Sequence, residues 1–317
     1  MSDTASDRAM SVDDYLNLLQ VSDANLRPQG DQIAYIVAES TTPARVRKAA
    51  SRVWLVDTDG GAARPVTADG MRAHSPRWSP NGEHLAFLGS RDNAGPDQVH
   101  ILSHAIGEAR ALTCGPASVA DVAWLPSSDG LIVAISDPAP EEDEESEHDA
   151  GRDWTIYEDG SRLSRLWRLD TATGDRSPIE HGDLHIWEFA VAPDSQSAVA
   201  IVSDTSFNWD WYRGRLVRID LSSGDVSALA SDTGQVTRPS WSPDSRMVAS
   251  IVSAFSDQGM TGGDVQVSDA DGATVITAGH PRSYLQILWN EPDQLLCAAI
   301  EGGELTIGRL ALSGEYS

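Results

Sequence analysis

The feature that most constrains this chain is a turn motif that recurs at a nearly regular interval along the sequence. A short apolar run ends at a proline six times, and a glycine in a second turn follows each of these prolines. The prolines are Pro28, Pro80, Pro126, Pro193, Pro243 and Pro292. The glycines are Gly61, Gly107, Gly174, Gly224, Gly272 and Gly314. A repeat of about 40–50 residues has the length of one β-propeller blade.

Each repeat reads as two hairpins. In residues 78–82 (WSPNG) and 241–245 (WSPDS), proline presets the backbone for a turn, and Asn, Asp or Gly tolerates the position that follows. Apolar runs come next, at 85–88 and 247–252, and a second type of turn is exemplified by 59–61 (DGG). Two hairpins make one four-stranded sheet. We therefore predict an all-β fold, a β-propeller of four-stranded blades with a short N-terminal helix.

The spacing of the repeated prolines and glycines predicts the boundaries of the domains and of the blades. A helical segment is expected at 1–23 and the propeller at 24–317. The six blades are expected at about 24–69, 70–115, 116–182, 183–231, 232–279 and 280–317. Six units either close a ring by themselves or belong to a seven-bladed propeller. Four tryptophans recur at the proline turn and are expected to pack between blades rather than to form a ligand-binding box. They are Trp78, Trp124, Trp241 and Trp289.

Ahead of the first repeat, residues 11–20 (SVDDYLNLLQ) predict a short helix. Ser11 can cap its N-terminus, and Asp13 and Asp14 favour the positive end of the helix dipole. The helix carries an apolar stripe that needs a surface to cover. The candidates for an interface with another domain are Tyr15, Leu16 and Leu19.

Two insertions interrupt the repeat. The first spans about 137–160, and its core at 141–147 (EEDEESE) predicts a solvated acidic loop, with calcium binding as the alternative. The second, at 207–213 (FNWDWYR), places aromatic side chains in a loop. Such a loop either contacts substrate or a partner domain, or packs locally on its own blade. The candidate residues are Trp209, Trp211, Tyr212 and Arg213.

Charge and hydropathy exclude several classes of protein. Lys+Arg 23 against Asp+Glu 48 gives a formal charge of −25, which repels the phosphate backbone of nucleic acids. No run of about 20 apolar residues is present, and the N-terminal segment lacks a basic and then apolar signal sequence. We therefore expect a cytoplasmic protein without a membrane or nucleic-acid partner. Cys114 and Cys297 are expected to stay reduced, although their pairing is the alternative.

Motifs that carry catalysis are missing from the sequence. It contains no G-x-S-x-G nucleophile elbow, no H-E-x-x-H, no P-loop and no G-x-G-x-x-G. His100 and His104 would lie on one face of a strand, too far apart to chelate a metal simply, and His181 and His185 flank a turn. We assign no catalytic residue, no metal site and no cofactor. The residues alone indicate a binding or gating module.

The repeat resembles the W-S-P-D-G propeller repeats shared by the translocation protein TolB and the prolyl oligopeptidase family of serine peptidases. Further stretches are similar to the acylaminoacyl-peptidase branch of that family, and the similarity covers nearly the whole chain. They include the helix followed by 21–35, the insert ending at 157–160 (YEDG), and the segments 166–174, 187–194 and 211–216.

The resemblance implies a propeller that precedes an α/β-hydrolase domain carrying a Ser–Asp–His triad. It also implies that the propeller limits access to small peptides, and that the N-terminal helix packs on the hydrolase domain. The region that would match the hydrolase domain is absent from these 317 residues, so no triad residue can be assigned. The first hypothesis is therefore the non-catalytic, substrate-gating domain of a serine peptidase that cleaves small peptides or N-terminal residues.

Two alternatives stay open. One is a stand-alone, TolB-like propeller that acts as a scaffold for protein–protein interaction, and a homo-oligomer is a further option for either reading. The other is a propeller enzyme with its active site in the central channel, such as a lactonase or a metal-dependent hydrolase. That chemistry needs converging carboxylate, amide or imidazole ligands, and the sequence shows no such cluster.

Overall fold

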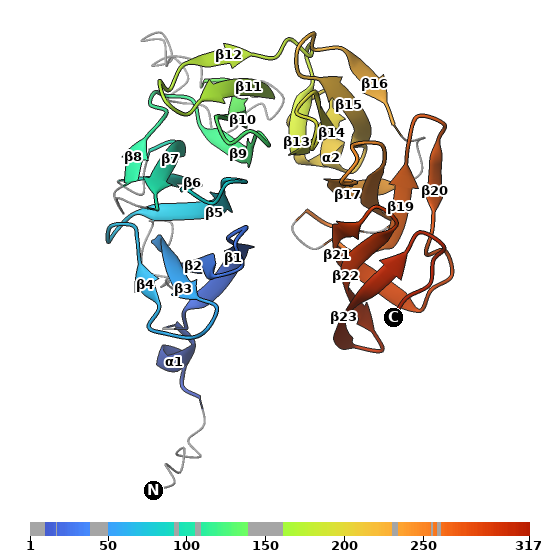
Figure 1. Cartoon of the computed structure of the whole chain (residues 1–317), viewed down its shortest axis with the longest axis horizontal. Helices are drawn as coiled ribbons and strands as arrows, with labels where there is room; N and C mark the ends of the chain where they lie inside the picture. Colours follow the sequence, from blue (N-terminus) through green and yellow to red (C-terminus); the bar gives the residue numbers. More distant parts are fainter. Residues whose placement is uncertain are drawn as a thin grey trace, which may run out of the picture. The chain divides into compact units, whose positions relative to one another are not determined.

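A computed structural model describes residues 10–16, 18–38, 50–91, 95–104, 109–138, 161–229, 234–254, 256–258 and 261–317. Almost all of its regular elements are strands (Figure 1), which confirms the predicted all-β propeller fold. The chain divides into two compact units, Met1–Pro116 and Ala117–Ser317. The core of the acidic insert at 141–147 lies outside the described residues.

The first unit contains two successive four-stranded sheets. The first is β1-β2-β3-β4 and the second is β5-β6-β7-β8, and one parallel pair, Ser51 with Arg72, joins them. The strands are β1 (Gln20–Leu26), β2 (Gln32–Ala38), β3 (Ser51–Asp57), β4 (Arg64–Pro65), β5 (Arg72–Trp78), β6 (His84–Ser90), β7 (Gln98–Ser103) and β8 (Ala109–Ala111).

The second unit contains four sheets. Three are four-stranded, β9–β12, β13–β16 and β17–β20, and the last sheet, β21-β22-β23, has three strands. The strands are β9 (Val119–Trp124), β10 (Gly130–Ser136), β11 (Ser164–Asp170), β12 (Arg176–Pro178), β13 (His185–Val191), β14 (Ser197–Ser203), β15 (Arg215–Asp220), β16 (Val226–Ala228), β17 (Gln235–Trp241), β18 (Val248–Ser253), β19 (Asp264–Ser268), β20 (Ala273–Val275), β21 (Arg282–Glu291), β22 (Gln294–Glu301) and β23 (Glu304–Ala311).

The N-terminal helix is shorter than predicted. Helix α1 covers Val12–Leu16, and β1 begins at Gln20, so the predicted helix 11–20 is wrong at its C-terminal end. The physical reason is that residues 20–26 pair with β2, where Val21 lies opposite Val37, and sheet hydrogen bonds replace a helix too short to be stable alone. The cap is confirmed, because the Asp14 amide donates to Ser11 Oγ at 3.1 Å. Neither helix of the described residues is long and apolar enough to cross a membrane.

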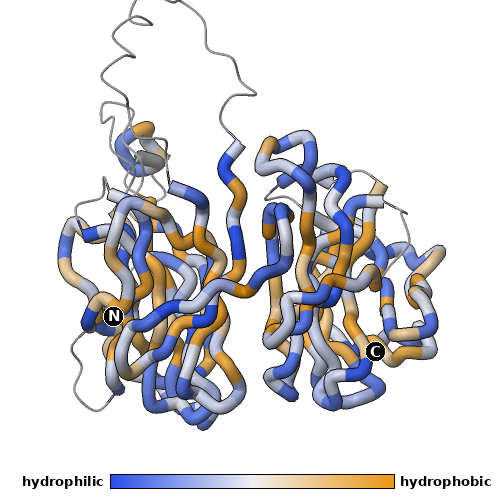
Figure 2. The backbone as a smooth tube through the Cα atoms, turned by 90° about the horizontal axis from the view of Figure 1, so that it is seen from above, coloured by the Kyte–Doolittle hydropathy of each residue, from blue (hydrophilic) through white to orange (hydrophobic). Residues whose placement is uncertain are grey.

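Apolar side chains pack between successive sheets, and Figure 2 shows that apolar stretches follow the strands while polar ones gather at the turns. Three of the four tryptophans at the proline turns, Trp78, Trp241 and Trp289, take part in this packing, as predicted. Trp241 Nε1 donates to the carbonyl of Ala190 in the preceding sheet at 3.0 Å, and Trp289 Nε1 donates to that of Ser240 at 2.9 Å. Trp78 packs in a core that contains residues of both sheets of the first unit.

The serine of the repeated turn has a structural role. Ser242 is fully buried, its Oγ donates to Asp244 Oδ1 at 2.6 Å, and it accepts the amide of Met247 at 2.9 Å. The hydroxyl therefore closes the turn from both sides. Ser79 makes the corresponding contacts with Asn81 and with the amide of His84. This explains why serine stands between tryptophan and proline in both turns.

We expect Ser242→Ala to lower the free energy of unfolding by about 1–3 kcal/mol, because the Met247 amide loses its partner in a buried turn. Urea unfolding followed by far-UV circular dichroism measures the change. The control is Ser227→Ala on the exposed edge strand β16, which should change stability by less than about 0.5 kcal/mol. Equal effects of the two substitutions would show that the hydroxyl does not hold the turn.

The last sheet has one uncovered apolar face. In its register Leu288 lies opposite Leu296, and Leu305 lies opposite Ile300, so these side chains share a face. The exposed fractions on this face run from 41% to 74%, the largest being that of Ile307. The central strand β14, by contrast, is buried along its whole length. Among the described residues, nothing covers this face of the last sheet.

Candidate functional site

The connections within each four-stranded sheet of the second unit differ in length. First and second strands are joined by tight turns, at 125–129, 192–196 and 242–247. Second and third strands are joined by longer connections, at 137–163, 204–214 and 254–263. Variable loops on a regular scaffold are where binding and catalytic residues concentrate. The end of the sheets that carries the longer connections is therefore the candidate functional site.

The connection 204–214 carries the predicted aromatic candidates. It contains the single-turn helix α2 (Asn208–Trp211), which contacts β14. Trp211 is 4% exposed and packs against its own sheet, whereas Trp209 and Tyr212 are 45% and 42% exposed. The ring of Phe207 stacks on Trp209 at 4.6 Å. Local packing thus accounts for Trp211, and Trp209 and Tyr212 present aromatic surface to solvent.

Hydrogen bonds tie the longer connections of neighbouring sheets to one another. The Tyr212 hydroxyl donates to Asp257 Oδ1 at 2.6 Å, which links 204–214 to 254–263. This bond raises the pKa of Tyr212 and lowers the pKa of Asp257. On the other side, the amide of Arg162 donates to Ser206 Oγ at 3.0 Å. The described parts of these three connections are therefore tied to one another, and we call them the rim.

A groove of about 650 Å³ is lined by residues of β14, β15, β16 and β17 and of the connections 204–214 and 254–263. Tyr212 and Arg213 are among its lining residues. Several of its lining residues are apolar, and sequence reasoning did not single them out, because they come from strands far apart in the chain. They include Leu184, Val202, Val217, Val226, Ala228 and Val236.

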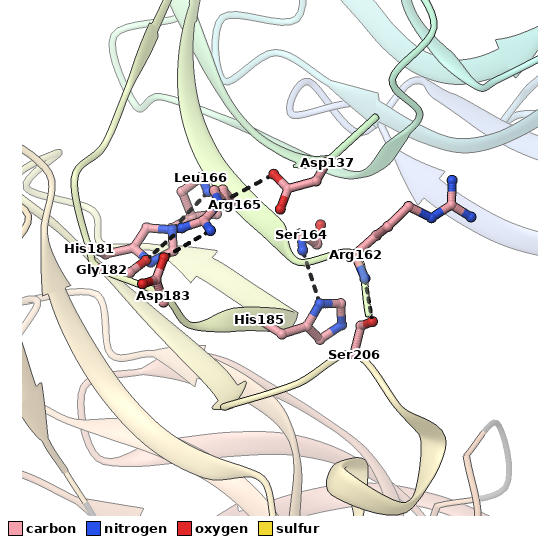
Figure 3. Close-up of polar contacts among 10 residues, drawn as sticks. All are labelled: Asp137, Arg162, Ser164, Arg165, Leu166, His181, Gly182, Asp183, His185 and Ser206. Carbon is pink, nitrogen blue, oxygen red and sulfur yellow. Dashed lines mark hydrogen bonds and ion pairs between the residues drawn. The ribbon is translucent and has the colours of Figure 1, made fainter. Parts of the chain in front are cut away.

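Two buried histidines and an arginine join β11 to the start of the next sheet (Figure 3). His185 Nδ1 accepts the amide of Ser164 at 3.0 Å, and His181 Nε2 accepts the amide of Leu166, also at 3.0 Å. Arg165 forms ion pairs with Asp137 and Asp183 at 3.3 and 3.0 Å. These contacts satisfy strand amides that the short strand β12 does not reach.

The electrostatics of this cluster keep both imidazoles neutral at pH 7. Burial lowers the pKa of His185 to about 4, and the charge of Asp137 opposes this only in part. Burial, and then the charge of Arg165, lowers the pKa of His181. Ser164 Oγ has no hydrogen-bond partner among the described residues, and His185 uses Nδ1 for the Ser164 amide. A base this weak, turned to a backbone amide, does not activate the hydroxyl.

His181 accepts a third-strand amide that threonine accepts in other sheets, although it stands one residue later in its repeat. In three sheets a threonine Oγ1 accepts a third-strand amide at 2.8–3.1 Å, from Val53, Val99 and Val265. These threonines are Thr67, Thr113 and Thr277. Sequence reasoning missed this contact, although a threonine after an apolar residue near the end of each of these repeats was a signal for it.

The other histidine pair does not converge on a metal. His100 is 4% exposed, its ring stacks on Phe87 at 5.2 Å, and burial lowers its pKa. His104 lies beside Trp78, with ring centroids 5.8 Å apart. Within the described part of the chain, no group of three His, Cys, Asp or Glu side chains could hold a metal ion. Of the helix candidates, Leu19 is 63% exposed, and the side chains of Tyr15 and Leu16 lie outside the described set.

Two curated proteins share sequence with parts of this chain. No protein-family model matches it. An uncharacterized peptidase of Bacillus subtilis, YuxL, is 32% identical over 129 residues, which are 41% of this chain and 19% of that protein. Tricorn protease homolog 1 of Streptomyces coelicolor is 36% identical over 85 residues, which are 26% of this chain and 8% of that protein. The matched segments are thus a small part of each relative.

Solved structures share the fold over most of this chain. The acylaminoacyl peptidase of Pyrococcus horikoshii aligns with a TM-score of 0.66 at 13% identity, covering 96% of this chain and 46% of the peptidase. The β-propeller domain of the Trilobed protease of Pyrococcus furiosus aligns at 0.61 and 11% identity, covering 94% and 84%. TolB of Acinetobacter baumannii aligns at 0.56 and 14% identity, covering 90% and 62%. The predicted resemblance to peptidase propellers and to TolB is confirmed.

Proposed function

We propose that this propeller is the non-catalytic, substrate-gating domain of a serine peptidase of the prolyl oligopeptidase type, which cleaves small peptides or removes N-terminal residues. The observation that carries the proposal is the alignment of 96% of this chain with 46% of an acylaminoacyl peptidase. The 129 residues shared with a Bacillus subtilis peptidase support it independently of the fold. The partner domain is then an α/β-hydrolase that carries the triad.

The rim described above suits such a role. A gate that sorts substrates by size needs loops that keep their shape, and hydrogen bonds from Tyr212 to Asp257 and from Arg162 to Ser206 hold neighbouring loops together. The exposed rings of Trp209 and Tyr212 offer contact area for substrate or for the catalytic domain. Leu19, with Tyr15 and Leu16, is proposed to contact the catalytic domain as well.

The test is to tag the gene at its native locus, recover its product and measure both intact mass and labelling by a fluorophosphonate probe, which reacts with activated serines. We expect a mass well above the 34.0 kDa of this chain and a labelled serine outside residues 1–317. The matched control is the 317-residue chain, which should remain unlabelled. A native mass of 34.0 kDa without labelling would contradict the proposal, and labelling of the 317-residue chain would contradict its non-catalytic part.

A TolB-like scaffold for protein–protein interaction is the second candidate, because 90% of this chain aligns with 62% of a TolB. This candidate predicts the opposite result in the same experiment, a native product of 34.0 kDa that carries no activated serine. The uncovered face of the last sheet is the surface proposed for self-association if the protein forms a homo-oligomer. We propose the cytoplasm as its compartment, since Cys114 and Cys297 are both free.

A further inference from the structure

The outer face of the last sheet, β21–β23, is apolar and open along all three strands. Its exposed side chains lie opposite one another in the sheet register, Leu288 with Leu296 and Ile300 with Leu305. Ile307 belongs to the same face, two residues after Leu305 in β23. The inner face of the same strands is closed, with exposed fractions of at most 1% at five positions. These are Tyr284, Leu295, Cys297, Ala299 and Leu310.

This outer face is also free of negative charge. The strand segments 283–290, 294–300 and 305–311 contain no acidic residue, although the chain has 48, and their one basic residue is Arg309. Glu291 lies opposite Gln294, at the end of the face and beyond these segments. Two copies of a chain with a formal charge of −25 repel each other over most of their surface. Contact through this face brings no carboxylates together at its centre, so it is where a second copy can approach.

The exposed area matches what a dimer needs. Five side chains that are 41–74% exposed present about 500 Å² of apolar surface, which is the size of patches that mark interaction sites. Ser283, Gln286 and Arg309 lie on the same face beside these side chains. Two such faces in contact would remove about 1,000 Å² of apolar surface, and with the polar positions the total approaches the range of about 1,200–2,000 Å² for stable interfaces.

The geometry of the contact is one that this chain already uses. The sheets β13–β16 and β17–β20 pack face to face through apolar side chains of both sheets. The outer face of β21–β23 offers the same kind of surface, without a partner among the described residues. A second copy of this sheet supplies a matching apolar face without introducing an acidic one.

We propose that two copies of this chain form a dimer through the outer faces of their last sheets, related by a twofold axis. Because each copy contributes the same patch, the contact closes after two copies and does not extend into a polymer. Dimerisation needs neither a catalytic domain nor a peptide substrate. It therefore goes beyond the proposed gating role, and a monomeric chain would leave that role unaffected.

Sedimentation velocity of the 317-residue chain, from about 1 to 200 µM, tests the dimer, because its population depends on concentration. We expect a species of twice 34.0 kDa that grows with concentration. Raising the salt concentration from about 0.05 to 0.5 M should tighten the dimer at least about threefold, since salt screens the repulsion between acidic copies. A monomer at every concentration and salt, a series of larger assemblies, or a dimer that salt weakens would each overturn the proposal.

Paired variants locate the contact. Ile307→Glu places an unpaired carboxylate in the face of each copy and should raise the dissociation constant at least about tenfold. Val226→Glu makes the same kind of change at an exposed apolar residue of the edge strand β16 and should leave the dimer unchanged. Leu288→Glu repeats the test from β21.

Far-UV circular dichroism and thermal unfolding show whether these variants fold. Ile307 and Leu288 are 74% and 61% exposed, so their substitution should leave the core intact. A dimer that survives both Ile307→Glu and Leu288→Glu, or one that Val226→Glu dissociates equally, would place the contact elsewhere and overturn the proposal.

Discussion

Acidification should destabilise the protein between about pH 6.5 and pH 4 through its buried histidines. The pKa of His185 falls from 6.5 to about 4 on folding, so in this range the unfolded chain binds a proton that the folded chain excludes. The contribution of neutral His185 to the free energy of unfolding is complete above pH 6.5. It declines as the pH falls and stops changing below about pH 4. At about 1.4 kcal/mol per pKa unit, His185 alone accounts for a loss of about 3 kcal/mol. His181 adds a loss of the same sign.

The experiment compares urea unfolding of wild-type and variant chains at pH 7, 5.5 and 4.5. His181→Gln offers the Leu166 amide an uncharged acceptor, so it should retain most of the stability at pH 7 and flatten the pH dependence. His185→Asn offers the Ser164 amide an uncharged acceptor and should flatten it further. His104→Asn, in an exposed turn, is the control. If all three variants follow the wild-type pH profile, the buried imidazoles are not the source of the acid sensitivity.

Trp241 links the sheets β13–β16 and β17–β20. Truncating it should lower the free energy of unfolding more than the other substitutions considered. Trp241→Ala removes a ring that is 8% exposed, its bond to the Ala190 carbonyl and its contact with the Arg218 guanidinium. We expect a loss of about 3–5 kcal/mol, a large part of the 5–15 kcal/mol typical of a folded domain. Trp241→Phe keeps most of the packing and should cost less, since it loses mainly the hydrogen bond.

Thermal and urea unfolding of both variants measure these losses. Trp209→Ala is the matched control, because it removes the same ring from a position that is 45% exposed. It should cost less than about 1 kcal/mol. A similar loss for Trp209→Ala and Trp241→Ala would mean that the repeated tryptophan does not hold neighbouring sheets together.

The repeat was predictable because its signals are local. Proline restricts its own backbone angle, and Ser242 forms hydrogen bonds with Asp244 and Met247. Six adjacent residues therefore determine the turn. The end of the N-terminal helix was not predictable in this way. Residues 20–26 alternate in no clear pattern, and their conformation depends on pairing with β2.

The residues of the candidate site were likewise predictable only where the signal is local. Aromatic residues in a loop pointed to Tyr212 and Arg213, but nothing in the sequence separates buried Trp211 from exposed Trp209. The groove walls come from β14, β15, β16 and β17, which only the stacking of two sheets brings together. The acceptor role of His185 likewise depends on β11, which belongs to the preceding repeat. Contacts between repeats are not encoded within any one of them.

The uncovered face of β21–β23 affects the order in which the sheets of the second unit unfold. In a stack of repeats, stability is roughly a sum of terms for each repeat and for each shared boundary. The inner sheets of this unit have two such boundaries, and the last sheet has one among the described residues. Transient opening therefore costs less at β21–β23 than in the two inner sheets of the stack. A protease that samples such openings would make its first cuts in the last sheet, and any molecule that covers this face would delay them.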